Sequence, residues 1–509
     1  MSENGERGWR GTVMVVARMK LNFDCYQALR ARDPRFDGHF FVAVKTTGIY
    51  CRPICPARTP LEKSCIFTET AAAAERAGFR PCLRCRPELA PGAPAISMEE
   101  ALFAAIRARA VQGDSVDEVA KHAGYSARQL RRLMLRGFGV TPVEIMQTER
   151  LLFAKKLLQE TDLGAAEVAL SAGFGSVRRF NALFSARYGQ TPTMVRRPRH
   201  PGRAERADVL RLRLSYRPPL AWPELLEYLG RRAVPGVEAV SLGEGSYMRT
   251  VSCGKRIGWL AVHRAPLGDW LEVTLPASLA EVSWQILTRL RELFDLDANP
   301  AAIDAHLGGD PLLGPGVRRH PGLRVPGAWS AFELAVRAVL GQQVSVAGAS
   351  TLAARLAVKF GEPVLSPFPF LNRLAPSAKV VAAANPDDIA AIGMPRARAL
   401  AVHELAAATV QGELDFGPGT TVEEAVTALR RVRGIGEWTA QYIAMRALRF
   451  PDAFPAADLG VRKALGTAGE AMPSEKQVLE RAETWCPWRA YAVLHLWQTL
   501  HAAAPSAKS

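Results

Sequence analysis

Four cysteines are the feature that most constrains the first third of the chain. Cys51 and Cys55 form a C-x3-C pair, and 26 residues later Cys82 and Cys85 form a C-x2-C pair. Four thiolates from two such short pairs can close a tetrahedron around Zn²⁺. Most four-cysteine zinc sites only hold a fold together, but a zinc-bound thiolate also stays deprotonated at neutral pH and can be a nucleophile. The spacing therefore predicts a Zn²⁺ site and leaves a structural and a reactive role open.

The charge balance and the remaining cysteines indicate the partner and the compartment. With 65 Lys and Arg against 49 Asp and Glu, the 509-residue chain has a net charge of +16, which favours a polyanionic partner, most simply nucleic acid. No apolar run of about 20 residues and no signal peptide is evident. The other cysteines are scattered, as expected for a reduced interior. We therefore expect several domains in a cytoplasmic protein with no membrane partner.

An internal repeat follows the cysteine-rich segment. The sequence EVAKHAGY at residues 118–125 returns as EVALSAGF at 167–174, and GVTP at 139–142 returns as GQTP at 189–192. Each copy has the pattern helix, glycine turn, helix, which is typical of a helix-turn-helix unit. A helical bundle with a solvated basic face is the alternative. We therefore expect two related units that lie in tandem.

These two copies resemble an AraC-type DNA-binding domain over residues 96–197. Ser126 is an expected N-cap, followed by a recognition helix over 127–136. Ser176 is the corresponding residue of the second copy, where the recognition helix runs to Arg187. The resemblance implies that side chains on these helices read base edges or hold phosphates in the major groove. The candidate DNA contacts are Arg128, Gln129, Arg131, Arg132, Arg178, Arg179 and Asn181.

The sequence segments around the cysteines resemble the amino-terminal domain of Ada-type proteins, over residues 21–90. They are TGIYCRPICPART at 47–59 and GFRPCLRCRP at 78–87. The resemblance implies that the first cysteine, Cys51, accepts a methyl group from a DNA methylphosphotriester and is used up. A thiolate can attack such a carbon by in-line displacement. Methylation would change the charge of the four-thiolate zinc site from −2 to −1, so repair could also strengthen DNA binding.

Several basic residues lie near the cysteines in sequence, and two roles are open for them. They are either solvated surface residues or phosphate contacts that bring the triester to Cys51. The residues are Lys45, Arg52, Arg58, Arg84 and Arg86.

The carboxy-terminal part contains a candidate helix-hairpin-helix, LRRVRGIGEWTAQY at residues 429–442. Gly434 and Gly436 permit a tight turn, and the free N–H groups at the start of the next helix can hold a DNA phosphate. The segment FPAADLGVR at 454–462 places Asp458 at a position 22 residues after Gly436. From the residues alone, Asp458 is as readily a helix N-cap as a catalytic group.

Together these segments resemble the helix-hairpin-helix DNA glycosylases of the AlkA (3-methyladenine) type, over residues 208–500. PGLRVPG at 321–327, VLGQQVS at 339–345 and WCPWRAY at 485–491 also match. The resemblance implies that Asp458 stabilises an oxocarbenium-like sugar and orients water. It also implies that Trp438, Tyr442 and Trp497 form a base pocket whose aromatic faces favour a cationic alkylated purine. Ordinary core packing is the alternative for each aromatic residue.

Three details refine this resemblance. Bifunctional relatives have a lysine nucleophile where Trp438 stands, so we expect a monofunctional glycosylase. The DNA wedge of the family is typically a leucine, whereas the matching residue here is Gln343, which fills the gap left by a flipped base with less apolar insertion. No Pro-Cys-His-Arg motif occurs after residue 90, so direct repair of O6-methylguanine is not expected.

The sequence thus predicts a multi-domain α+β protein. We expect a small four-cysteine zinc α/β domain at 19–90, an all-α double helix-turn-helix domain at 96–197 and a basic linker at 198–207. An α+β subdomain at 208–300 and an all-α helix-hairpin-helix glycosylase core at 301–500 follow.

The predicted function is repair of, and response to, DNA alkylation. The expected partners are double-stranded DNA, both damaged DNA and a promoter site, and RNA polymerase, and we expect a monomer associated with the bacterial nucleoid. The main alternative is a methylation-activated regulator with an inactive glycosylase domain. A repair enzyme that regulates nothing and a purely structural zinc site are two further alternatives.

Overall fold

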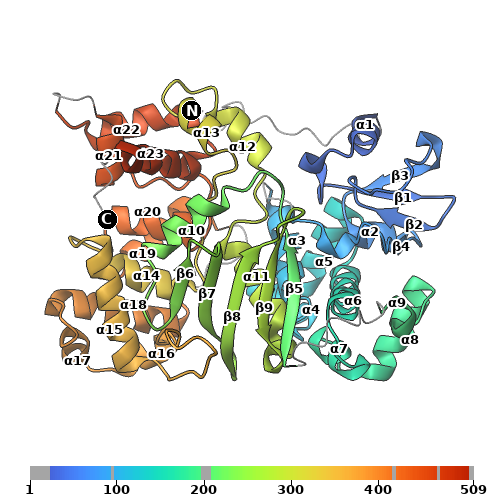
Figure 1. The fold of residues 1–509 in the computed structure, drawn as a ribbon, viewed down its shortest axis with the longest axis horizontal. Helices are drawn as coiled ribbons and strands as arrows, with labels where there is room; N and C mark the ends of the chain where they lie inside the picture. The colour runs from blue at the N-terminus through green and yellow to red at the C-terminus, as the bar shows by residue number, and fades with distance from the viewer. Residues whose placement is uncertain (1–22, 93–96, 197–207, 415–419, 467–470, 504–509) are drawn as a thin grey trace, which may run out of the picture.

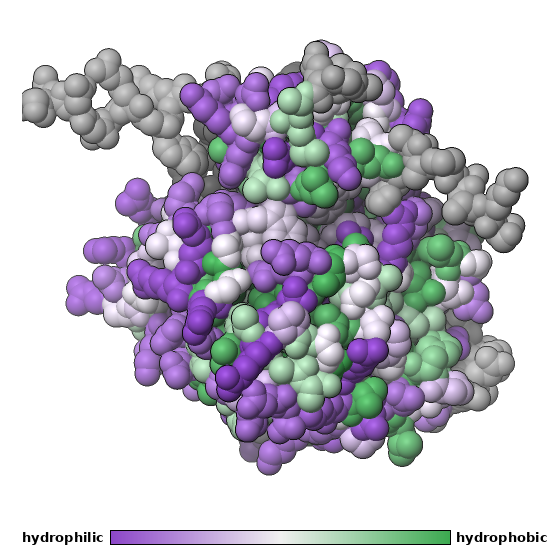
Figure 2. Space-filling model, turned by 90° about the vertical axis from the view of Figure 1, so that its left-hand side faces the viewer, coloured by the Kyte–Doolittle hydropathy of each residue, from purple (hydrophilic) through white to green (hydrophobic). Residues whose placement is uncertain are grey.

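The computed structural model describes residues 23–92, 97–196, 208–414, 420–466 and 471–503. The predicted linker at 198–207 lies outside the described residues. In Figure 1 the cysteine-rich domain lies at the right above the helix-turn-helix helices, a β-sheet occupies the centre, and the carboxy-terminal helices form the left side. The helical side is shown face-on in Figure 2, where hydrophobic residues lie among hydrophilic ones near its centre.

The cysteine-rich domain is a four-stranded sheet with a few short helices. The strand order is β3-β1-β2-β4, with β2 and β4 parallel and the other pairs antiparallel. The apolar residues before the Thr47-Gly48 turn form β1. The elements are α1 (Phe23–Ala31), η1 (Pro34–Phe36), β1 (Phe41–Val44), β2 (Ile49–Cys51), η2 (Glu62–Ser64), β3 (Cys65–Thr68), α2 (Ala71–Arg76), β4 (Arg80–Pro81) and η3 (Pro87–Leu89).

The next region is all-α and contains the two repeated units. Ser126 and Ser176 cap the two recognition helices, α5 and α8, as predicted. The turn glycines Gly124 and Gly173 have φ values of +76° and +77°, a left-handed conformation that glycine adopts without strain. The helices are α3 (Met98–Arg109), α4 (Val116–His122), α5 (Ala127–Phe138), α6 (Pro142–Glu160), α7 (Ala165–Ser171), α8 (Val177–Tyr188) and α9 (Pro192–Val195).

A five-stranded antiparallel sheet follows, in the order β5-β9-β8-β7-β6. Its last strand ends at Pro276, and the elements that follow are helical. The elements of this region are β5 (Val209–Ser215), α10 (Trp222–Gly230), β6 (Glu238–Ser241), β7 (Ser246–Cys253), β8 (Arg256–Arg264), β9 (Trp270–Pro276), η4 (Ala277–Val282) and α11 (Ser283–Leu293).

The remainder of the described chain is helical. Its helices pack on one another through α14, α18 and α20 and through α21 and α23. They are α12 (Pro300–Leu307), α13 (Gly314–Arg319), α14 (Ala331–Leu340), α15 (Val346–Phe360), α16 (Ala378–Ala383), α17 (Pro386–Ala390), α18 (Arg396–Gln411), α19 (Val422–Arg430), α20 (Glu437–Arg446), α21 (Leu459–Leu465), α22 (Glu475–Ala482), η5 (Glu483–Trp485) and α23 (Arg489–Ala503). The predicted fold class is therefore confirmed.

Buried ion pairs join the cysteine-rich domain to helix α6. Glu88 contacts Lys155 at 2.5 Å and Arg86 at 2.9 Å, and Glu160 contacts Arg86 at 2.7 Å and Lys156 at 3.0 Å. None of these side chains is more than 6% exposed. A buried charge that loses its partner costs several kcal/mol, about 3–5, so this network fixes how the two domains sit against each other. Among the described residues, no helix is long and apolar enough to cross a bilayer.

Candidate functional site

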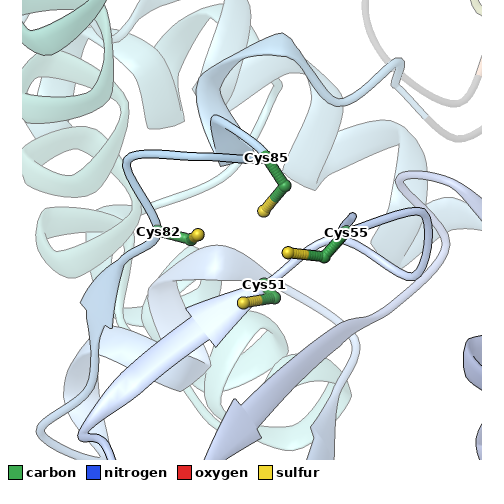
Figure 3. Close-up of side chains that lie close together, drawn as sticks. All are labelled: Cys51, Cys55, Cys82 and Cys85. Atoms are coloured by element: carbon green, nitrogen blue, oxygen red, sulfur yellow. The ribbon is translucent and has the colours of Figure 1, made fainter. Parts of the chain in front are cut away.

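The four predicted ligands come together at one end of the small sheet. Cys51 ends β2, Cys55 follows it in a loop, Cys82 follows β4 and Cys85 precedes η3. The four sulfurs point toward one another (Figure 3) and all lie within 4.8 Å of one another. A Zn–S bond of about 2.3 Å places sulfurs roughly 3.8 Å apart in a tetrahedron. The donor set therefore fits Zn²⁺, and the chain carries a zinc site.

The four cysteines differ in what surrounds them. Cys55, Cys82 and Cys85 are buried, whereas Cys51 is partly exposed. The backbone N–H of Arg52 donates to Cys85 Sγ at 3.3 Å, and that of Arg84 donates to Cys82 Sγ at 3.3 Å. Such hydrogen bonds stabilise negative charge on a thiolate and make it less basic. Burial and these bonds make Cys82 and Cys85 poorer nucleophiles than the accessible Cys51.

Two of the five basic residues near the cysteines have neither of the roles that the sequence left open. Arg52 and Arg86 are 7% and 4% exposed and form buried ion pairs, so they are neither solvated nor available to phosphate. Arg52 pairs with Asp37 and donates to the Cys85 carbonyl at 3.1 Å. Their sequence position beside metal ligands gave no sign of this, because Asp37 is 15 residues from Arg52 and Glu160 is 74 residues from Arg86, although Glu88 also pairs with Arg86. The other three basic residues, Lys45, Arg58 and Arg84, are exposed.

The site also connects with the central sheet. The backbone carbonyl of Asp37 accepts hydrogen bonds from Arg217 Nε at 3.0 Å and Nη2 at 2.8 Å. Arg217, just after β5, is 1% exposed. A buried chain of contacts therefore runs from Cys85 through Arg52 and Asp37 to Arg217.

The candidate contacts of the two recognition helices lie on the surface. All seven side chains are exposed: Arg128, Gln129, Arg131 and Arg132 on α5, and Arg178, Arg179 and Asn181 on α8. Gln129 has a second role that its motif did not predict. Its amide oxygen accepts from the Ser126 N–H at 2.9 Å, which completes a reciprocal cap of α5. Its amide nitrogen takes no part in these capping bonds.

The predicted hairpin has the expected geometry. It joins α19 to α20, and Gly434 has a φ of +82°. A Cβ at this position would lie 2.7 Å from the Ala401 Cβ, so a larger residue would force the hairpin away from α18. Gly436 is exposed and stands at the N-cap of α20. The first N–H groups of α20 therefore face a surface that can hold a phosphate.

Asp458 contacts both a helix end and two aromatic side chains. It is the N-cap of α21, because its Oδ1 accepts from the Val461 N–H at 2.9 Å. The same oxygen accepts from Trp497 Nε1 at 2.9 Å, and Oδ2 accepts from Trp438 Nε1 at 3.0 Å. Its side chain is only partly buried. A capping contact uses one lone pair, so the carboxylate keeps acceptor capacity on a fixed, accessible group.

The three predicted pocket aromatics meet around this carboxylate. Trp438 and Tyr442 stack with ring centroids 5.5 Å apart and planes 14° apart. Tyr442 and Trp497 are 6.5 Å apart and tilted by 47°. All three rings are partly buried. They are therefore not simple core residues, and they form one aromatic cluster in contact with the Asp458 carboxylate.

Three further residues of this site were not predicted: Tyr228, Arg232 and Arg446. Tyr228 stacks on Trp497 with centroids 6.2 Å apart, and its hydroxyl lies 3.3 Å from that of Tyr442. Arg446 donates to the Tyr442 hydroxyl at 2.7 Å. Tyr228 lies on α10, 214 residues before Tyr442, so no spacing in the sequence could connect them.

The charges in this pocket change the acidity of Tyr442. Burial alone would raise the pKa of its phenol, but the guanidinium groups of Arg446 and Arg232 and the Tyr228 hydroxyl outweigh burial and lower the pKa to about 7. The pKa of Tyr228 is raised to about 12, chiefly by burial. The pKa values of the two neighbouring hydroxyls are therefore shifted in opposite directions.

Gln343 lies at the tip of the turn between α14 and α15. It is exposed and has a φ of +57°, a left-handed conformation that is uncommon for residues other than glycine. Its neighbour Gln342 points inward and donates to the Gly434 carbonyl at 2.8 Å and to Thr439 Oγ1 at 3.1 Å. The tip is therefore held against the hairpin and against α20.

Four domain-family models match successive parts of the chain. "Metal binding domain of Ada" matches residues 24–88 and "Helix-turn-helix domain" matches 119–198. "AlkA N-terminal domain" matches 211–330 and "HhH-GPD superfamily base excision DNA repair protein" matches 336–488. The resemblances drawn from the sequence are therefore confirmed.

A Mycobacterium tuberculosis protein named "Probable bifunctional transcriptional activator/DNA repair enzyme AlkA" is 39% identical, over 94% of this chain and 96% of its own length. The chain belongs to this Ada/AlkA family. Over 56% of its length, this chain is also 38% identical to the Escherichia coli "DNA-3-methyladenine glycosylase 2", of which it covers 96%. It covers 81% of the Bacillus subtilis "Bifunctional transcriptional activator/DNA repair enzyme AdaA", at 33% identity over 34% of this chain.

Membership in this family agrees with the site geometry. The chain carries zinc-binding, helix-turn-helix and base excision repair domains, and it is a DNA-binding repair protein. The cysteine cluster lies in the part matched to Ada, and Asp458 lies in the part matched to the base excision superfamily. Tyr228 lies in the AlkA N-terminal match, Trp438 and Tyr442 lie in the base excision match, and Trp497 lies beyond the end of that match.

Proposed function

We propose that this chain removes methyl groups from DNA phosphotriesters at Cys51, excises alkylated bases such as 3-methyladenine with Asp458, and binds promoter DNA through α5 and α8. The observation that carries the excision role is the Asp458 carboxylate, fixed by two indole N–H groups beside an aromatic pocket. The exposure of Cys51, the least buried of the four sulfur ligands, carries the transfer role.

In the transfer reaction, the Cys51 sulfur forms a bond to the methyl carbon of the triester. The bond between that carbon and the phosphate oxygen breaks, and its electron pair stays on the oxygen, which leaves a phosphodiester anion. When bound, Zn²⁺ keeps the thiolates deprotonated at neutral pH. The product is a thioether that no group in the site can reverse, so each chain acts once. The exposed residues Lys45, Arg58 and Arg84 are the candidates for holding the phosphates nearby.

In the excision reaction, the bond between the sugar C1′ and the base nitrogen breaks and its electron pair leaves with the base. Positive charge develops on the sugar, and the fixed Asp458 carboxylate stabilises it. Water then bonds to C1′ and gives up a proton, which leaves an abasic site. Trp438 stands where bifunctional relatives have a lysine, and its indole N–H donates a hydrogen bond to Asp458. The absence of a lysine at this position supports a monofunctional enzyme.

The remaining parts of the proposal concern DNA and partners. The exposed side chains of α5 and α8 read a promoter site, and methylated Cys51 strengthens that binding because the zinc site then repels phosphates less. RNA polymerase is the partner that such activation needs.

We propose a monomer associated with the nucleoid in the cytoplasm, with domain limits at 19–90, 96–197, 208–300 and 301–500. Gln343 fills the gap that a flipped base leaves.

The excision role is tested with Asp458→Asn. Asparagine keeps the side-chain shape and one acceptor oxygen for the α21 cap, but it removes the negative charge. We expect single-turnover release of 3-methyladenine to fall by about 100-fold or more, while binding to an abasic-site analogue stays near that of the original chain. The matched control is Asp452→Asn, which removes a carboxylate paired with Arg489 at 2.6 Å on the same segment. Equal release by the original chain and Asp458→Asn would reject the catalytic role.

The transfer role is tested by incubating the zinc-loaded protein with DNA that carries labelled methyl phosphotriesters and mapping the label by peptide mass. We expect one methyl group per chain, on Cys51. Cys65→Ala is the matched control, because Cys65 is a partly exposed thiol of the same domain outside the cluster. Label on no cysteine would leave a structural zinc site.

A second candidate function is a methylation-activated regulator with an inactive glycosylase domain. The polar Gln343 at the wedge position favours it. This candidate predicts DNA binding that strengthens after methylation at fixed salt, together with no base release by the original chain. Base release without any gain in DNA affinity would instead indicate a repair enzyme that does not regulate.

A further inference from the structure

The wedge turn at residues 341–345 has two chemically distinct parts. Apolar residues follow the tip, with Val344 39% exposed and Val346, the first residue of α15, 43% exposed. Its tip is polar, because Gln343 stands between α14 and α15 with φ at +57°. Apolar side chains at an exposed turn fit the faces of bases and sugars, whereas an amide at the point of the turn does not gain from stacking alone.

The tip is held in place by contacts from three directions. Gln342 Nε2 donates to the Gly434 carbonyl of the hairpin and to Thr439 Oγ1 on α20. Arg398 Nη2 on α18 donates to the Gln342 carbonyl at 2.6 Å. Because Trp438 is the neighbour of Thr439, the tip has a fixed position relative to the hairpin and to the pocket beside Asp458. Gln343 itself makes no hydrogen bond with any described residue.

An amide at such a fixed tip can do more than occupy space. When a purine leaves the duplex, its partner base loses the hydrogen bonds of its pairing edge. Donors and acceptors that are left without partners and shielded from water cost free energy. A glutamine amide offers both donor and acceptor atoms. It can face the N3–H and a carbonyl of thymine, or the amino group and N3 of cytosine. A purine on the opposite strand would occupy part of the space that the side chain needs.

We propose that the Gln343 amide hydrogen-bonds to the unpaired base opposite the excised nucleotide and makes the enzyme prefer a pyrimidine there. This inference rests on the proposed gap-filling role of Gln343. The preference matches the proposed substrates, because alkylated purines in a duplex normally face thymine or cytosine. An apolar residue at position 343 would fill the same gap without distinguishing the opposite base.

The test uses the full-length protein and duplexes with an uncleavable tetrahydrofuran abasic analogue, so that no chemical step contributes. The base opposite the analogue is thymine in one duplex and 2,4-difluorotoluene, a thymine isostere with very weak hydrogen bonding, in the other. Fluorescence anisotropy gives the ratio of the two dissociation constants. We expect the original chain to bind the thymine duplex about 3- to 10-fold more tightly, and to bind a duplex with guanine opposite the analogue more weakly than either.

Gln343→Leu should bring the ratio close to one while it keeps tight binding, and Gln343→Ala should weaken binding to both duplexes. Each ratio compares two duplexes with the same protein preparation, so a partly unfolded variant does not alter it. The matched control is Gln411→Leu, an exposed glutamine at the end of α18, which should keep the original ratio.

Two contrary outcomes are separable. A ratio near one for the original chain, with weaker binding by Gln343→Ala, would overturn the reading of the opposite base and leave the gap-filling role intact. Unchanged binding by both variants on every duplex would overturn the gap-filling role and, with it, the inference.

Discussion

The zinc site and the Asp458 site both contain hydrogen bonds to an anionic side chain, but the bonds have different roles in the two sites. At the zinc site, backbone N–H groups contact Cys82 and Cys85, which are buried, and Cys51 remains accessible. At the other site, two indole N–H groups contact the one carboxylate that we propose as catalytic. At the zinc site the bonds make the Cys82 and Cys85 sulfurs less nucleophilic than that of Cys51. At the other site they hold the Asp458 carboxylate itself in place.

This difference follows from what each reaction requires. A methyl acceptor is used once, so it needs one sulfur that is more reactive than its neighbours. A glycosylase acts repeatedly on a developing cation, so it needs a carboxylate that stays ionised and does not move between cycles. The two sites lie in different domains and share no residue, although a buried chain through Asp37 and Arg217 joins the domains.

The largest expected effect comes from removing zinc. Without the metal, four thiol groups within 4.8 Å of one another have no common partner, and the small domain loses a main source of stability. We expect chelator-treated protein to lose methyl transfer completely and to retain base excision within about two-fold. Parallel assays of the two activities, with zinc measured by mass spectrometry, check this. Excision that falls with zinc content would indicate that the sites are coupled.

A smaller effect is expected from Trp497→Phe, which removes one of the N–H donors to Asp458 and keeps an aromatic ring. Hydrogen bonds to a charged group contribute about 1.5–3 kcal/mol, so single-turnover excision should fall roughly 10- to 100-fold. Trp284→Phe is the matched control, because it removes an indole hydrogen bond to the Ala108 carbonyl at 3.1 Å, outside the site. An unchanged rate in Trp497→Phe would mean that the indole bond does not position the carboxylate.

The pocket should also show an unusual tyrosine titration. The pKa of Tyr442 is lowered from 10.0 to about 7, since Arg446 and Arg232 outweigh the effect of burial. We expect a step in phenolate absorbance near pH 7 in the original chain that is missing in Tyr442→Phe. Because the folded pKa is below the unfolded value, the ionised phenol stabilises the fold above pH 10, and that contribution is lost as the pH falls through about 7. A titration without this step would contradict the arrangement.

The smallest effect concerns Glu75 on α2, at the junction between the cysteine-rich domain and the helix-turn-helix domain. Burial raises its pKa from 4.5 to about 7, although Arg187, Thr148 and Tyr50 oppose the shift. The folded state then binds the proton of Glu75 more tightly, so the contribution of this group to stability is fully present below pH 4.5 and is lost as the pH rises through about 7. Glu75→Gln should flatten this part of the stability profile, as measured by thermal unfolding at pH 5 and pH 7.5. A profile that keeps its slope would assign the slope to other groups.

Much of the site could be predicted because its signals are local. The cysteine pairs, the repeated turns and the hairpin glycines each lie within a few residues of one another, and such spacings depend on covalent geometry. Family resemblance added roles for Asp458 and the three pocket aromatics, and those roles remain predictions. The sequence also left Asp458 open between a cap and a reactive group, and the structure has one carboxylate in contact with both kinds of partner.

Local sequence patterns were therefore enough to identify the residues that can hold zinc, the helical repeats and the hairpin that can face DNA. The burial of Arg52 and Arg86, the partial exposure of Cys51 and the contact of Tyr228 with Trp497 became evident only from the packing of the whole chain. The tie between Gln342 and Gly434 spans 92 residues, and the pair of Tyr228 and Tyr442 spans 214. Contacts of this kind depend on how whole helices and sheets pack, and packing is set by the sum of many distant side chains rather than by any local pattern.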